Sequence, residues 1–266
     1  MNMLKTSKIA IGSHRGLSNT LHPNIAPNTI ASFETLEQQH ADYIECDCIM
    51  TTDNAIILYH DPLINNKPII KQTLNSLHKH HPNIETLDSL LKILTSPPIT
   101  PLSNKTLCLE LKFYESEAKK KELFATTIIK TLVSYNMQDS VIIVSFDPDL
   151  LYLIYKQNNQ LSLGLNLAFQ TTHPTCFQLT QKALDHPILS TLTYCCPHID
   201  DINHPKLPTL PKLVWESENE DKILNYLIKL DIINMIKKWC SQKNIHGFTT
   251  NTVEAIYKLF KNNSLK

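Results

Sequence analysis

The chain of 266 residues has only four glycines, no long apolar run and no excess of charge of either sign. No stretch approaches the ~20 consecutive apolar residues that span a bilayer, so we expect no stable membrane insertion. The 25 basic and 25 acidic residues balance, and there is no basic block of the kind that binds nucleic acid. We therefore expect a soluble protein without a nucleic-acid partner, whose turns are formed mainly by asparagine and proline.

The cysteines also exclude some classes of protein. There are seven, an odd number, and their spacing fits neither a zinc site nor a disulfide framework. Such cysteine usage is typical of a reducing compartment. The first residues lack the apolar segment of a cleavable signal peptide. Together these features predict a cytoplasmic location.

Strand and helix signals alternate along the chain, which is the pattern of repeated βα units and predicts an α/β fold with roughly eight strands. No linker divides residues 1–266, and α/β barrels of this length are commonly one domain, so we expect a single domain. The segment 62–85 is expected to be a short, insertion-like excursion. Strands are expected at 9–13, 42–50, 56–60, 106–112, 140–145, 162–167, 190–194, 212–216 and 245–249. The main helices are expected at 29–40, 87–94, 118–135, 150–157, 176–184, 221–243 and 253–260. Asn28 is expected near the cap of the first of them.

Two of these strands carry paired charges. Glu45 and Asp47 lie two residues apart, so they share one face of a strand whose other face is apolar. Adjacent carboxylates repel each other and are costly to bury unless a cation lies between them. All-oxygen ligation suits Mg²⁺, Mn²⁺ or Ca²⁺ better than zinc. Glu110 and Lys112 repeat the spacing on a later strand and would add a third ligand and a positive charge. Taken singly, each acid could simply end a strand and face solvent.

Two histidines follow apolar strand signals. His14 and His60 both stand where a strand ends, which is the ligand-binding edge of a parallel α/β fold. Histidine titrates near neutral pH, so a pair can serve as base and acid in one displacement reaction. A single histidine in such a place is more often structural, but here each precedes a charged residue. Arg15 can clamp phosphate oxygens through two hydrogen bonds, and Asp61 can orient its neighbour.

With these residues the chain resembles the glycerophosphodiester phosphodiesterase (GDPD) family. The family pattern is HRG, PENT-x-x-x-F, E-x-D and HD, followed later by E-x-K and S-F-D. The matching segments here are His14-Arg15-Gly16, Asn28-Thr29 through Phe33, Glu45-Cys46-Asp47, His60-Asp61, Glu110-Leu111-Lys112 and Ser145-Phe146-Asp147. The match is dense from about residue 9 to 62 and thin after Asp147.

The resemblance implies a TIM (β/α)8 barrel of the phospholipase C-like phosphodiesterase type, with a short insertion after the HD motif. It implies a divalent cation, Mg²⁺ or Ca²⁺, held by Glu45, Asp47 and Glu110. It further implies the remaining roles: His14 and His60 as the acid/base pair, Arg15 and Lys112 on the phosphate, and Trp215 at the mouth that receives the substrate.

The chain departs from the family pattern at several positions. Ala26-Pro27 stands in place of the family's Pro-Glu, so an acidic residue is missing there. Near the end, the family's W-T and T-D-x-P motifs appear only as Trp215-Glu216 and Thr249-Thr250-Asn251. The first change is expected to alter the loop after His14, and the later ones the side of the pocket that receives the substrate. The expected cation ligands are intact.

The expected activity is hydrolysis of a small-molecule glycerophosphodiester to glycerol 3-phosphate and an alcohol. One alternative is a lysophospholipase D-like activity on lipid phosphodiesters, which predicts an apolar channel at the barrel mouth lined by Phe169, Trp215 and Phe248. A second alternative is a barrel that binds phosphodiesters without catalysis. The intact histidine pair favours an enzyme.

Overall fold

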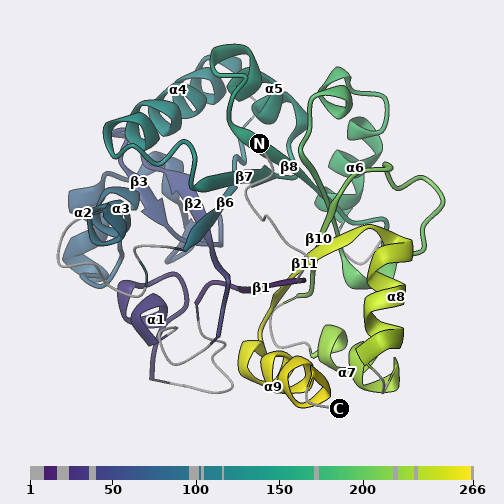
Figure 1. The fold of residues 1–266 in the computed structure, drawn as a ribbon. Helices are drawn as coiled ribbons and strands as arrows, with labels where there is room; N and C mark the ends of the chain where they lie inside the picture. Colours follow the sequence, from purple (N-terminus) through teal and green to yellow (C-terminus); the bar gives the residue numbers. More distant parts are fainter. Residues whose placement is uncertain are drawn as a thin grey trace.

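The structure is a computed structural model that describes residues 9–16, 24–35, 40–95, 102, 105–115, 117–170, 174–217, 221–230 and 233–264. Eight parallel strands close into a barrel, because β1 pairs with β2 on one side and with β11 on the other. Figure 1 views the molecule with the strands at the centre and the helices around them. The barrel strands are β1 (Ala10–Ser13), β2 (Tyr43–Met50), β6 (Thr106–Leu111), β7 (Val141–Ser145), β8 (Ser162–Leu167), β9 (Tyr194–Pro197), β10 (Lys212–Trp215) and β11 (Ile245–Thr250). The expected (β/α)8 fold is confirmed.

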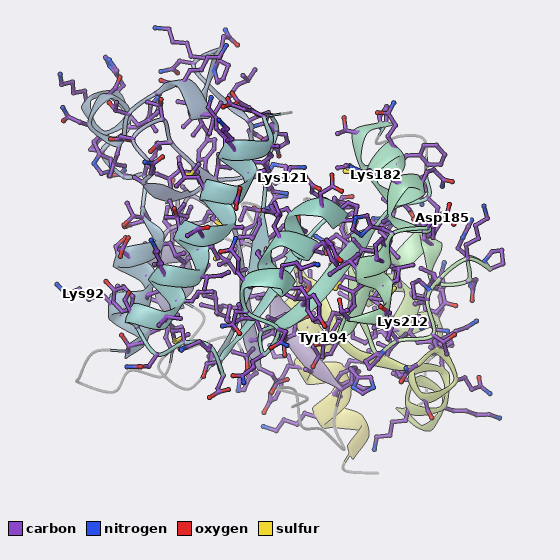
Figure 2. The ribbon with its side chains drawn as sticks, turned by 90° about the horizontal axis from the view of Figure 1, so that it is seen from above. Lys92, Lys121, Lys182, Asp185, Tyr194 and Lys212 are labelled. Atoms are coloured by element: carbon purple, nitrogen blue, oxygen red, sulfur yellow. The ribbon has the colours of Figure 1, made fainter. Side chains whose placement is uncertain are left out.

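Helices cover the outside of the barrel. They are α1 (Ile30–Glu34), α3 (Leu87–Thr95), α4 (Ala118–Ser134), α5 (Pro148–Gln157), α6 (Pro174–Ala183), α7 (Lys222–Leu230), α8 (Ile233–Lys243) and α9 (Val253–Ser264). Figure 2 shows the molecule from above, with Lys92 on α3 and Lys182 on α6, two of these outer helices. No helix in the described part of the chain has both the length and the apolar character needed to cross a bilayer.

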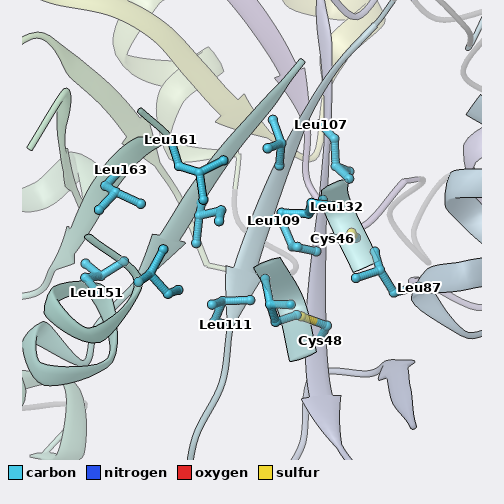
Figure 3. Packing of buried hydrophobic residues seen from close by; sticks show 14 of the residues in the cluster. Cys46, Cys48, Leu87, Leu107, Leu109, Leu111, Leu132, Leu151, Leu161 and Leu163 are labelled. Carbon is cyan, nitrogen blue, oxygen red and sulfur yellow. The ribbon is translucent and has the colours of Figure 1, made fainter. Parts of the chain in front are cut away.

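Strand alternation decides which side chains reach the interior of the barrel. On β6, Leu107, Leu109 and Leu111 face the helices, where they belong to one buried cluster with Cys46 and Cys48 of β2 (Figure 3). Their neighbours on the same strands must therefore face the barrel axis. This alternation places the charged residues of β2 and β6 inside the barrel.

Several predicted boundaries were wrong. Residues 56–58 form β3 (Ile56–Leu58), which pairs antiparallel with β2 and lies outside the barrel. The strand expected at 190–194 begins instead at Tyr194, after the 3₁₀ turn Pro187–Ser190. The helix expected over 221–243 is two helices, α7 and α8; residues 231 and 232 lie outside the described residues. The first helix covers 30–34, and 36–39 of its expected range also lie outside.

The expected excursion after β3 is short but contains secondary structure. The strands β4 (Leu63–Ile64) and β5 (Lys67–Pro68) form a hairpin, followed by a 3₁₀ turn (Ile69–Lys71) and by α2 (Leu74–His80). The hairpin turn uses two asparagines with positive φ, Asn65 and Asn66, where other proteins often use glycine. Ile64, Ile69 and Leu77 are buried and pack on β2 and β3, which anchors the excursion to the barrel.

Candidate active site

Three carboxylates meet on two neighbouring strands. β2 carries Glu45 and Asp47, and β6 carries Glu110 in direct register with Asp47. One carboxylate oxygen from each of the three residues lies within 4.8 Å of the others. The structure thus brings together the three acids that the spacing singled out.

Two cationic side chains neutralise part of this acidic cluster. Arg15 Nε lies 3.0 Å from Asp47 Oδ2, and Lys112 Nζ lies 3.2 Å from Asp47 Oδ1 and 2.7 Å from Glu110 Oε1. Burial alone would raise the pKa of Asp47, but Lys112 and Arg15 together hold it well below its usual range. Burial would likewise lower the pKa of Lys112, but the carboxylates of Asp47 and Glu110 raise it. Three acids face two bases, so one negative charge is left over when all five groups are ionised.

Glu45 carries this unbalanced charge. Its side chain is buried, and burial, followed by the nearby Asp47 and Glu110, raises its pKa well above the usual value. Oε2 accepts a hydrogen bond from the backbone N–H of Arg15 at 2.9 Å. Oε1 is also buried and accepts no hydrogen bond from any of the described residues. A buried carboxylate oxygen without a donor, beside two more carboxylates, fits a divalent cation with oxygen ligands.

The loop after β1 shapes one side of this cluster. Arg15 and Gly16 both have positive φ, +54° and +84°, which turns the Arg15 N–H toward Glu45. A Cβ at residue 16 would lie 2.3 Å from Ser32 Oγ of α1, so only glycine fits there. The backbone therefore requires the glycine of the HRG motif.

Asn28 is a site residue whose role the sequence reasoning missed. It was expected near the cap of the first helix, but the cap is Thr29, whose hydroxyl accepts from Ser32 N. Asn28 instead donates to Asp47 Oδ2 at 2.9 Å and accepts from Asp47 N at 3.0 Å. Its place in the matched Asn-Thr motif was the only available signal. These two bonds fix the orientation of the Asp47 carboxylate.

The two histidines stand in different environments. His14 is 8% exposed, and its Nδ1 lies 2.9 Å from Asn251 Oδ1. Burial and then the positive charge of Arg15 lower the pKa of His14 to about 3. The His60 side chain is 38% exposed, and its Nδ1 lies 2.7 Å from Asp61 Oδ1. Both rings line the cavity that contains the acidic cluster.

This cavity has a volume of about 560 Å³ and is lined by both charged and apolar residues. The charged lining includes the histidines, Glu45, Glu110 and the two cationic residues. The apolar lining includes Phe113, Tyr114, Val144, Phe146, Leu179, Leu213 and Trp215. Trp215 is fixed by a 2.9 Å hydrogen bond from Nε1 to Cys196 O and by an edge contact with Phe146.

The other aromatic residues expected at the mouth do not line it. Phe248 is fully buried in the cluster between β11 and the outer helices, where it stacks at 6.3 Å on Trp239. Phe169 stacks at 3.6 Å on His204 and is absent from the cavity wall. Strand position explains the error for Phe248, because neighbouring residues on β11 face opposite sides of the barrel.

The fold and the site define the class of the protein: a (β/α)8 barrel that can hold a divalent cation beside histidines and cationic groups at the carboxyl ends of its strands. The sequence profile of the glycerophosphoryl diester phosphodiesterase family matches residues 14–255, and the chain belongs to this family. A curated glycerophosphodiester phosphodiesterase of Bacillus subtilis (strain 168) is 38% identical over 60 residues, or 23% of this chain. That match spans about a fifth (19%) of the relative's own length.

Solved structures share the fold over almost the whole chain. A glycerophosphodiester phosphodiesterase from Parabacteroides distasonis is 18% identical, with a TM-score of 0.72 over 96% of this chain and 98% of that one. A phosphodiesterase from Oleispira antarctica, solved in complex with the product sn-glycerol-3-phosphate, is 17% identical, with a TM-score of 0.62 over 95% and 96%. At these identities the likeness establishes the barrel architecture.

Proposed function

We propose that the protein hydrolyses glycerophosphodiesters to glycerol 3-phosphate and an alcohol with the help of a divalent cation. The observation that carries this proposal is one cavity that unites three clustered carboxylates, two histidines and two cationic side chains. Family membership supports the same reaction class. The Oleispira phosphodiesterase, which binds sn-glycerol-3-phosphate as its product, supports a small-molecule substrate.

Glu45, Asp47 and Glu110 are the residues that would hold the cation. Their oxygen donors suit Mg²⁺ or Ca²⁺, and Glu45 Oε1 is a buried oxygen that lacks a donor among the described residues. When bound, such a cation would neutralise phosphate charge and activate the attacking oxygen. The unbalanced negative charge of the cluster favours its uptake.

The remaining groups would handle phosphate charge and protons. Arg15 and Lys112 can donate hydrogen bonds to the phosphate oxygens and stabilise the charge that develops there. One histidine removes a proton from the attacking water, or from the glycerol hydroxyl, while that oxygen bonds to phosphorus. The other histidine gives a proton to the alcohol oxygen as its bond to phosphorus breaks. In the water route, the products are glycerol 3-phosphate and the free alcohol.

A product assay over a panel of glycerophosphodiesters, with and without chelator, tests the proposal. His14→Ala and His60→Ala should each lower turnover by about 10²–10⁴-fold while Mn²⁺ binding, measured by calorimetry, stays intact. His80→Ala is the matched control, because His80 is exposed on α2. Wild-type turnover in either site variant would refute the paired histidines. Tight binding of substrate without any product would favour a non-catalytic barrel.

A second candidate, hydrolysis of lysolipid phosphodiesters, is supported by the apolar residues that line the cavity. Phe113 and Tyr114 also line a smaller adjoining cavity of about 250 Å³ under the excursion, beside Leu63, which is 45% exposed. An acyl chain would fit such a surface. Comparing glycerophosphocholine with lysophosphatidylcholine discriminates between the two, and Trp215→Ala should raise KM for the lipid more than for the soluble substrate. The cytoplasmic location and the single-domain organisation stay predictions.

A further inference from the structure

The side-chain amide of Asn251, which follows β11, lies between Ser217 and His14. Asn251 Nδ2 lies 2.8 Å from the backbone carbonyl oxygen of Ser217. A carbonyl oxygen can only accept a hydrogen bond, so the NH₂ group of the amide must face Ser217. The amide oxygen is thereby turned toward His14 Nδ1, 2.9 Å away. The contact with Ser217 fixes the orientation of the amide without reference to the histidine.

This orientation determines the tautomer of His14. An amide oxygen accepts hydrogen bonds and donates none, so His14 Nδ1 must carry the hydrogen. In the neutral ring the lone pair then lies on Nε2. Because Nδ1 is occupied by Asn251 and the ring lines the cavity, Nε2 is the nitrogen left to exchange protons with a bound substrate.

Glu216, which follows β10, holds this arrangement in place. It is fully buried, and its Oε1 accepts from Thr250 Oγ1 at 2.5 Å and from Asn251 N at 3.1 Å. Its Oε2 accepts from Ile223 N, in the first turn of α7, at 2.8 Å. One carboxylate therefore joins the end of β11 to the start of α7, and the backbone that carries Asn251 cannot shift independently.

We propose that Asn251 is a positioning residue that fixes His14 in the Nδ1–H tautomer, and that Glu216 keeps Asn251 in place. This inference rests on the proposed function, in which His14 transfers a proton. It assigns a role to Glu216 and Asn251, two positions near the end of the chain at which the sequence departs from the family pattern. Neither side chain needs to touch the substrate; both act through the ring of His14.

The first test reads the tautomer directly and does not require turnover. Long-range ¹H–¹⁵N NMR of the histidine side chains distinguishes the two neutral tautomers, and His14→Gln assigns the His14 signals by their loss. We expect the Nδ1–H form in the wild type and in Asn251→Asp, whose carboxylate still accepts from Nδ1. We expect a mixture or the Nε2–H form in Asn251→Leu. A wild-type ring in the Nε2–H form would overturn the proposal.

The second test separates positioning from folding. Asn251→Leu should lower kcat by about 100-fold with KM and Mn²⁺ affinity nearly unchanged, since orienting partners of this kind are commonly worth 10–100-fold. Asn251→Asp should recover part of the loss, and Glu216→Ala should lower kcat in the same direction. Asn225→Ala, an exposed asparagine on α7, and Glu122→Gln, an exposed glutamate on α4, are the matched controls.

The outcomes distinguish this inference from the proposed function. If His14→Ala is inactive while Asn251→Leu keeps wild-type kcat, the positioning role is wrong and the proposed function stands. If Asn251→Leu loses cation affinity and thermal stability together with kcat, its role is structural and the inference fails. If the wild type hydrolyses no glycerophosphodiester, the proposed function fails, and the NMR measurement still decides the tautomer.

Discussion

The buried, neutral His14 should make the protein lose stability in mild acid. Burial and the charge of Arg15 lower the pKa of His14 to about 3, whereas an unfolded chain has the ordinary value of about 6.5. Below pH 6.5 the unfolded chain binds a proton that the folded protein excludes. The stabilising contribution is therefore fully present above pH 6.5 and is lost as pH falls toward 3.

The size of the effect follows from the shift. A pH of 4.5 lies about two units below the pKa of this histidine in the unfolded chain, whereas the ring in the folded protein is still neutral. At ~1.4 kcal/mol per unit, the loss of unfolding free energy is about 2.7 kcal/mol. The variant His14→Gln cannot take up this proton. We expect wild type to lose about 2.7 kcal/mol more unfolding free energy than His14→Gln between pH 7.5 and 4.5.

Urea unfolding of the metal-free protein, followed by tryptophan fluorescence at both pH values, measures this difference. The other titrating groups are common to both proteins and cancel in the comparison. His80→Gln, an exposed residue on α2, should behave as wild type. Equal loss of unfolding free energy in wild type and His14→Gln would refute the reasoning, because the ring would then be able to ionise in the folded protein.

Three further predictions concern the acidic cluster. Glu45→Gln should weaken Mn²⁺ binding in calorimetry by at least about 100-fold. It should also raise the melting temperature of the metal-free protein, because it removes a buried, unbalanced charge. Wild-type cation affinity in this variant would contradict the prediction. Gly16→Ala should cost about 2 kcal/mol or more in urea unfolding, since φ is +84° and the new Cβ would meet Ser32 Oγ; an unchanged midpoint would show that the loop relaxes freely. Asn28→Ala should lower the unfolding free energy by about 2 kcal/mol and the Mn²⁺ affinity about tenfold, because it leaves Asp47 without its two hydrogen bonds with Asn28. Full affinity would show that Arg15 and Lys112 suffice to orient the Asp47 carboxylate.

Local sequence patterns indicated which charged residues would share a strand face at the candidate site. Residues two apart on a strand share a face wherever the strand lies, so Glu45 and Asp47, and likewise Glu110 and Lys112, could be paired from spacing alone. The closed barrel then required only that β2 and β6 be neighbours in register. The structure places the three acids side by side on this basis, and their role as cation ligands stays a prediction.

The same patterns failed where a contact joins distant parts of the chain. Asn28 looked like a helix cap because caps are recognised locally, whereas its partner Asp47 lies 19 residues away. Phe248 looked like a pocket residue, but the pairing of β11 turned it toward the helices. The strand signal over 56–60 was real, but it could not reveal that β3 pairs antiparallel outside the barrel.

The sequence by itself determined which residues are chemically able to act, because residue type, strand alternation and the glycine at position 16 are local properties. Only the tertiary structure decided how two of them are held. His14 and Asn251 are 237 residues apart. Glu216, which lies 35 residues before Asn251, joins it to α7. Closing β1 against β11 brings these groups together, and hydrogen bonding between such distant segments is set by the register of the barrel.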